Sequence, residues 1–151
     1  MNTNTSTTIQ ETRARLSTLW IFIMLNMLFA DIFSFMQPGA LEQIMSGSAE
    51  QIQITPEFLL AAAMLTEIPI AMVLLSRVLA HKPNRIANIA AALVTIVFVI
   101  GGGSMTATYI FFATIEIVGA LCIIWFAWRW RVSQTHALGV ALKTRELGGE
   151  S

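Results

Sequence analysis

Four runs of apolar residues, separated by polar or glycine-rich breaks, dominate this sequence. They cover residues 17–36, 57–79, 86–105 and 107–128. Each run approaches or exceeds the roughly 20 residues that an α-helix needs to cross a bilayer. The pattern therefore predicts an all-α membrane protein, a bundle of four transmembrane helices.

Local signals mark the ends of several spans. In TPEF (55–58), Thr55 can cap a helix, Pro56 suits the first turn and Glu57 complements the positive end of the helix dipole. HKPNR (81–85) and GGGS (101–104) predict the breaks on either side of the third span. The long connection between the first two spans predicts a short helix over residues 40–46.

The predicted organisation has three parts, which are an N-terminal segment (1–16), a transmembrane domain (17–130) and a C-terminal tail (131–151). The basic residues orient them, because cytoplasmic loops of membrane proteins are enriched in Lys and Arg. All nine basic residues lie in the N-terminal tail, around the 81–85 break, or at and after the end of span four: Arg13, Arg15, Arg77, Lys82, Arg85, Arg129, Arg131, Lys143 and Arg145. Four spans place all of them on one side, so both termini are expected in the cytoplasm.

A cleaved signal peptide is the alternative interpretation of the first span, because two arginines precede its apolar run. The run is longer than the usual apolar core of about 7–15 residues, and it contains Asp31. Both features favour a retained helix.

Composition supports the membrane class and limits the chemistry. The chain is 56% hydrophobic and 12% charged, whereas a soluble domain is about a quarter charged. A single cysteine, Cys122, excludes an intramolecular disulfide, and His81 and His136 lie outside the apolar runs, which excludes a bis-histidine haem in the membrane. No metal-ligand spacing or cofactor motif occurs, so neither a metal nor a cofactor is expected.

Three carboxylates, Asp31, Glu67 and Glu116, lie inside the apolar spans. A charge at the bilayer centre costs about 2.5–3.5 kcal/mol on the mildest scale, and such residues usually face a bundle interior or a wet cavity. Polar residues at similar depth extend the candidate proton- or ligand-binding set, which comprises Asp31, Glu67, Glu116, Asn26, Thr95 and Tyr109.

Small residues predict which helix faces pack. Ala63 and Ala71 flank Glu67 at i−4 and i+4, and Gly119 and Ala120 follow Glu116. Small residues let membrane helices approach closely, so both glutamates are expected on packing faces, where they converge and share a proton. On the third span, one face carries Asn88, Ala91, Ala92 and Thr95. Four tryptophans at one level, Trp20, Trp125, Trp128 and Trp130, predict an interfacial aromatic belt.

The leading functional hypothesis is a small carboxylate-lined protein that binds or transports a proton, a cation or another small molecule. The alternative is a non-enzymatic membrane scaffold or accessory subunit whose buried carboxylates are structural. An enzyme acting on lipid or quinone is least supported, because no catalytic constellation is present. The expected partners are the lipid bilayer and a proton or small cation; a homo-oligomer stays open, and nucleic acid is not expected because the basic residues flank membrane spans.

The segments LWIFIMLNMLFADIFSFMQPG, EIPIAMVLLSR, NRIAN and IEIVGALCIIWFAWRW resemble small four-span prokaryotic membrane proteins in families of unknown function. The resemblance covers roughly residues 15–131 and implies a bacterial inner (plasma) membrane setting. The layout is loosely similar to that of DoxX-like four-helix proteins. The size class is similar to that of small multidrug resistance transporters, which carry a membrane glutamate in the first span where this chain has Asp31.

Overall fold

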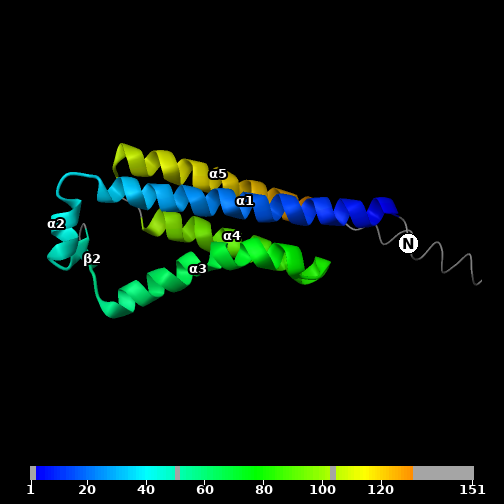
Figure 1. Cartoon of the computed structure of the whole chain (residues 1–151), viewed down its shortest axis with the longest axis horizontal. Coiled ribbons are helices and arrows are strands. Elements are labelled where there is room, and N and C mark those ends of the chain that lie inside the picture. The colour runs from blue at the N-terminus through cyan, green and yellow to red at the C-terminus, as the bar shows by residue number, and fades with distance from the viewer. Residues whose placement is uncertain (1–2, 50–51, 103–104, 131–151) are drawn as a thin grey trace, which may run out of the picture.

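Four long helices make up most of the protein (Figure 1), whose computed structural model describes residues 3–49, 52–102 and 105–130. They are α1 (Thr3–Phe35), α3 (Pro56–Val78), α4 (His81–Gly101) and α5 (Ala107–Arg129). The connection between α1 and α3 holds the short helix α2 (Ala40–Met45) and two strands of two residues each, β1 (Ser48–Ala49) and β2 (Ile52–Gln53). The strands pair antiparallel, with Ser48 opposite Gln53 and Ala49 opposite Ile52. The predicted four-helix architecture is confirmed, and this small hairpin is its one departure from an all-helical chain within the described residues.

The helices and the apolar runs have different boundaries. α1 begins at Thr3, well before the predicted start of the first span, because its polar first turns are compatible with helix although they are not apolar. α4 begins at His81, so Pro83 lies in its first turn, where a proline is tolerated. The break before α4 is therefore only Leu79 and Ala80, both extended. The short helix expected over residues 40–46 is confirmed as α2.

Local capping explains two of the helix starts. Thr55 accepts a hydrogen bond from the backbone N–H of Phe58 at 3.2 Å, and Pro56 occupies the first turn, as the sequence predicts. Thr106 caps α5 in the same way, with the N–H of Tyr109 at 3.3 Å. Each cap satisfies one of the N–H groups that lack a partner within the helix.

The long helices alternate in direction, and α1 and α4 each pack against both α3 and α5. The core between them includes Trp20 and Ile23 from α1, Met72 from α3, Ala92 from α4 and Ile123 from α5. We call the end that carries α2 and the hairpin the loop end. The opposite end, where α1 begins and α5 finishes, is the terminal end (Figure 1). All basic residues of the described helices lie toward the terminal end.

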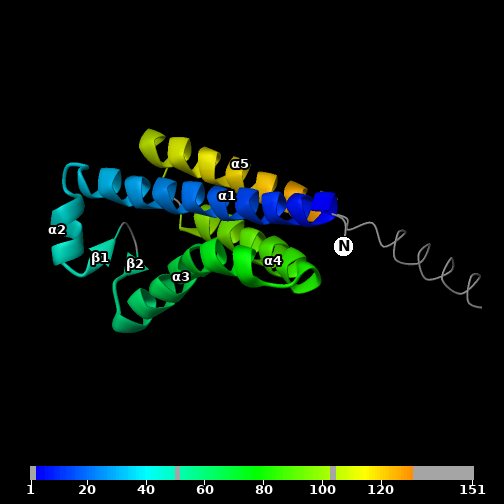
Figure 2. The same cartoon turned by 45° about the vertical axis from the view of Figure 1, so that its right-hand side comes forward.

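The first half of α3 leaves the bundle (Figures 1 and 2). The buried residues of this helix are Pro69, Met72 and Ser76, all in its second half. Pro69 lacks an N–H, so the carbonyl of Leu65 loses its usual helical donor, and a proline inside a helix kinks it. The divergence opens the loop end of the bundle between α3 and its neighbours.

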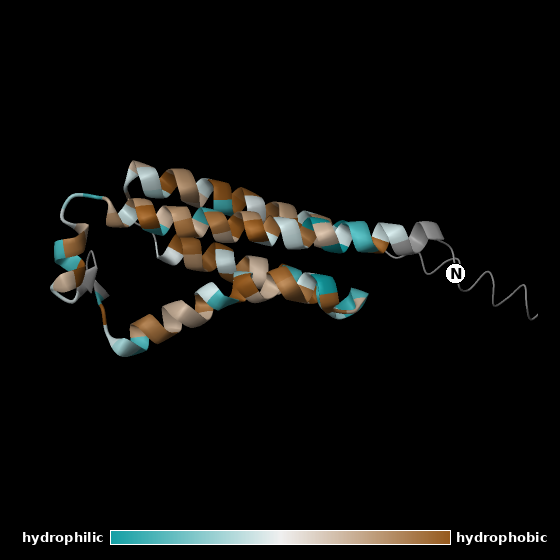
Figure 3. Ribbon diagram, viewed as in Figure 1, coloured by the Kyte–Doolittle hydropathy of each residue, from teal (hydrophilic) through white to brown (hydrophobic). Residues whose placement is uncertain are grey.

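Most of the apolar surface of the helices is not covered by the chain itself. Each helix contains a stretch long and apolar enough to cross a membrane, and only 11–33% of these stretches is buried. Hydrophobic residues run along the middle of all four helices, while hydrophilic residues gather toward the two ends (Figure 3). Exposed apolar surface on this scale indicates contact with lipid.

Candidate functional site

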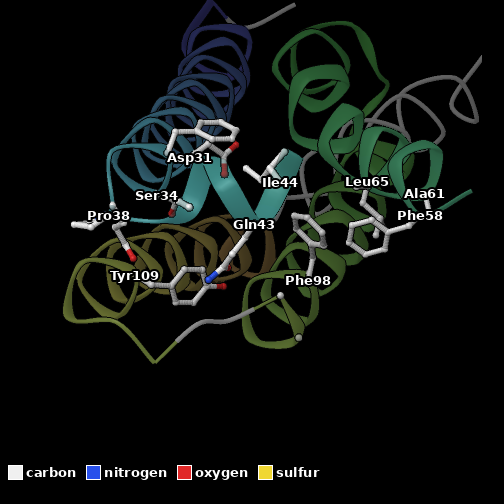
Figure 4. A pocket seen from close by; sticks show the side chains of 16 residues that line it. Asp31, Ser34, Pro38, Gln43, Ile44, Phe58, Ala61, Leu65, Phe98 and Tyr109 are labelled. Atoms are coloured by element: carbon white, nitrogen blue, oxygen red, sulfur yellow. The ribbon is translucent and has the colours of Figure 1, made fainter. Parts of the chain in front are cut away.

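A cavity of about 800 Å³ lies at the loop end, where α3 diverges from the bundle. All five helices contribute to its wall, and Figure 4 shows side chains from each of them around one space. The lining residues include Asp31, Phe58, Leu65, Phe98 and Tyr109. The volume falls in the usual range of small-molecule pockets, about 300–1,000 Å³.

The lining is mainly apolar and aromatic, with few polar groups. Phe58, Phe98 and Tyr109 supply rings from three different helices, and Leu65 adds aliphatic surface. Asp31 is the one carboxylate among the described lining residues, and it is exposed. The cavity is thus a mainly apolar space with one carboxyl group among its described lining residues.

Tyr109 ties two walls of the cavity together. Its half-buried hydroxyl donates a hydrogen bond to the backbone carbonyl of Val99 on α4. Its ring remains part of the lining. This predicted site residue therefore has both a structural bond and a position on the site.

Glu116 does not line this cavity and is buried on α5, with 5% of its surface exposed. Its Oε1 is buried without a hydrogen-bond partner. A buried polar atom without a partner is uncommon in native proteins, and a buried charge without one is costly. Glu116 is therefore the group in this region that most needs a proton or a cation nearby.

Asp31 on α1 and Glu116 on α5 belong to two helices that pack against each other. On one side of the two carboxylates, Gly119 lies so near Ile23 that an added Cβ would be 3.0 Å from Ile23 Cγ1. On the other side, the rings of Phe33 and Phe112 are 5.7 Å apart. The stretches of α1 and α5 that carry Asp31 and Glu116 therefore lie side by side, between these two contacts.

Glu67 does not lie on a packing face, in contrast to the prediction from its flanking alanines. Glu67 and Ala63 are exposed, because the first half of α3 does not pack against the bundle. The face that packs carries Pro69 and Met72 instead. Glu116 is buried and Glu67 is exposed, so the structure does not bring these two carboxylates together on one packing face.

Asn26 and Thr95 do not line the cavity. The Asn26 amide donates to the Phe22 carbonyl of its own helix at 3.0 Å, and the Thr95 hydroxyl donates to the Ala91 carbonyl at 2.9 Å. Thr95 is buried on the predicted packing face of α4, together with Asn88, Ala91 and Ala92. That face is confirmed, as is the α5 face of Glu116, Gly119 and Ala120.

A second polar group, which the sequence did not reveal as a unit, lies toward the terminal end. Trp20 Nε1 and Ser76 Oγ both donate to Asn88 Oδ1, at 2.7 and 3.1 Å. The Asn88 amide donates to Asn84 Oδ1 at 2.6 Å, and the Asn84 amide donates to the Ser76 carbonyl at 2.7 Å. These buried groups satisfy one another across α1, α3 and α4, which is the behaviour of a structural network. The i, i+4 spacing of Asn84 and Asn88, which places them on the same face of a helix, is the feature of the sequence that could have predicted this network.

This network also corrects the predicted aromatic belt. Trp20 is fully buried in the network, and Trp130 is buried with its ring 4.6 Å from that of His81. Trp125 and Trp128 are exposed at 58% and 61%, as an interfacial belt requires.

The fold and the site together describe a bundle of four membrane-length helices with a carboxylate-bearing cavity at one end. The chain belongs to the family of unknown function DUF6326, whose model matches residues 7–137. No curated protein and no solved structure matches the chain. The family membership agrees with the resemblance to small four-span families of unknown function.

Proposed function

We propose that this protein binds an amphiphilic organic cation in the cavity at the loop end, in exchange for a proton held by Asp31 and Glu116. The observation that carries the proposal is the buried, unpartnered Oε1 of Glu116 on α5, the helix that packs against α1, whose Asp31 lines the cavity. Such an exchange is the elementary step of a small proton-coupled cation transporter.

The cavity recognises both parts of such a ligand. Its aromatic rings, Phe58, Phe98 and Tyr109 among them, offer apolar surface, and the face of a ring attracts a cation. Asp31 supplies the opposite charge. In this partly dehydrated space a charge pair is stronger than in water, and a ligand without a positive charge could not take the place of the proton.

Glu116 couples the cation to the proton. Two carboxylates on neighbouring helices in an apolar region do not both ionise readily, and in this proposal they hold one proton when no cation is bound. A cation beside Asp31 offsets the repulsion and lets the proton leave. The charged groups of the neighbouring helices do not replace it, because the described basic side chains of α3, α4 and α5 lie at the terminal end.

The setting proposed for this chemistry is a bacterial inner membrane. The helices span the bilayer with the terminal end in the cytoplasm, since the basic residues of the described helices lie there. The cavity then faces the outer side, and the divergent half of α3 gives it an opening toward the lipid, from which an amphiphilic cation would enter.

The test is binding of benzyltriethylammonium to the purified protein in a non-ionic detergent, measured by calorimetry, with the uncharged carbon analogue as the second ligand. Wild-type protein should bind the cation at least about tenfold more tightly than the neutral analogue, the factor that corresponds to about 1.4 kcal/mol. Asp31→Asn should remove this preference.

Glu67→Gln is the matched control, because it removes another carboxylate of the apolar spans, one that lies outside the cavity. It should bind the cation like the wild type. Equal binding of both ligands by the wild type, or equal loss in Asp31→Asn and Glu67→Gln, would contradict the assigned site.

A membrane scaffold or accessory subunit is the second candidate. The observation that favours it is the satisfied network of Trp20, Asn88, Asn84 and Ser76, which fixes three helices without any ligand. Under this alternative the variants Asp31→Asn and Glu116→Gln would fold and behave like the wild type in every binding assay.

A further inference from the structure

A pair of arginines bridges α1 and α3 at the terminal end, away from the cavity. Arg13 Nη2 on α1 donates to the backbone carbonyl of Leu79 at the end of α3, at 2.7 Å. Arg77 Nε on α3 donates to Ser17 Oγ on α1 at 3.0 Å, and Ser17 in turn donates to the Val73 carbonyl at 2.8 Å. The anchor points on α1, residues 13 and 17, are one helical turn apart, so both guanidinium groups lie at the same stretch of the α1–α3 seam.

These bonds position the two guanidinium groups but do not neutralise them. A guanidinium has five N–H donors, and each of these bonds uses one, to an uncharged acceptor. Arg13 Nε is buried without a partner, while Arg77 is exposed. Glu11 is the only acidic residue toward this end among the described residues, and it is exposed and makes no ion pair with either arginine.

The start of α4 adds to the positive potential. It follows Leu79 directly, its N-cap Ala80 provides no side-chain cap, and its first turn has no acidic residue. The N-terminal end of a helix carries a partial positive charge, which attracts anions such as phosphate. Lys82 stands in this same turn. The seam therefore presents two fixed guanidinium groups and a helix N-terminus at the level where an apolar span meets the headgroups.

We propose that the seam between α1 and α3 at the terminal end binds the phosphodiester of an anionic phospholipid through Arg13 and Arg77. Planar guanidinium groups match phosphate oxygens with two parallel bonds. Basic pockets between membrane helices are a known means of binding such headgroups. A lipid is the source rather than a soluble phosphate, because the seam borders the apolar surface of both helices, where acyl chains can lie.

The test uses the full chain in a non-ionic detergent at 150 mM salt and measures phosphatidylglycerol binding by native mass spectrometry. Phosphatidylcholine, whose phosphate is internally compensated, and inorganic phosphate are the comparison ligands. Arg77→Gln should weaken phosphatidylglycerol binding at least about tenfold, the loss expected for one charge-assisted hydrogen bond. Arg13→Gln should do the same.

Arg129→Gln is the matched control, since it removes the same charge at the same end from a side chain that lies over the ring of Trp125 on α5. It should retain binding within about twofold, so that an equal loss in all three variants would refute a specific site in favour of general charge attraction. Equal binding of phosphatidylcholine, or full competition by inorganic phosphate, would also overturn the proposal. If Arg13→Gln does not fold, Arg77→Lys provides the test, because it keeps the positive charge but loses the planar guanidinium group. A severalfold loss of phosphatidylglycerol binding would support the site, and unchanged binding would contradict it.

Discussion

Replacing Gly119 with alanine tests the interface between α1 and α5, the helices that carry Asp31 and Glu116. Gly119 is buried on α5, and a Cβ added there would lie 3.0 Å from Ile23 Cγ1, 3.4 Å from Ile23 Cδ1 and 3.8 Å from Phe22 Cδ1. Ile23 is fully buried, so it cannot turn away freely. The alanine must push α1 from α5 or distort Ile23.

The expected magnitude is the difference between two effects. Overpacking a well-packed contact costs about 1–3 kcal/mol, while replacing a helical glycine with alanine gains up to about 1 kcal/mol in helix propensity. With a middle cost of about 2 kcal/mol and a gain of about 1 kcal/mol, Gly119→Ala should lower the free energy of unfolding by about 1 kcal/mol. Reversible unfolding in mixed micelles, followed by circular dichroism, measures this difference.

Gly101→Ala provides the control, because Gly101 also lies in a helix but has no atom within 4 Å of an added Cβ. It should change stability by no more than about 1 kcal/mol, in the stabilising direction. If Gly119→Ala were as stable as the wild type, the close approach of α1 to α5, and with it the proposed pairing of Asp31 and Glu116, would be refuted.

Two further predictions concern the polar network and the topology. Asn88→Ala should lower the free energy of unfolding by at least about 2 kcal/mol, because Trp20 Nε1 and Ser76 Oγ both lose their acceptor. Asn26→Ala is the control and should cost less than about 1 kcal/mol, because the Asn26 amide donates only within its own helix. Equal costs would count against the network. Reporter fusions at both termini should give cytoplasmic signals and a fusion within residues 40–49 an external one; a cytoplasmic signal from the internal fusion would reverse the proposed orientation.

The parts of the fold that depend on neighbouring residues in the sequence could be predicted from it. The start of α3 followed from Thr55 and Pro56, since a cap and a first-turn proline act locally. The beginning of α1 was misplaced because hydropathy measures membrane affinity, whereas a helix continues through polar residues that have no reason to end it.

The candidate site depends on contacts between helices, which the sequence alone does not fix. Small residues identified the packing faces of α4 and α5 correctly. The same reasoning failed for Glu67, because α3 diverges before Pro69 and its alanines meet no other helix there. Which carboxylate lies nearest to Glu116 depends on how α1 and α5 align, and that alignment is set by contacts such as Phe33 with Phe112. Asn84 was assigned to a break, although it belongs to the buried network.

Proton release on cation binding tests the proposed exchange most directly. Benzyltriethylammonium carries no exchangeable proton, so any proton released into a weakly buffered detergent solution comes from the protein. Because binding favours the deprotonated pair, cation affinity should rise with pH, by up to about tenfold per unit for one proton. Glu116→Gln keeps the shape of a protonated glutamate but cannot release its proton. Wild-type protein should release about one proton per bound cation and Glu116→Gln none; equal release from both proteins, or none from the wild type, would contradict the exchange.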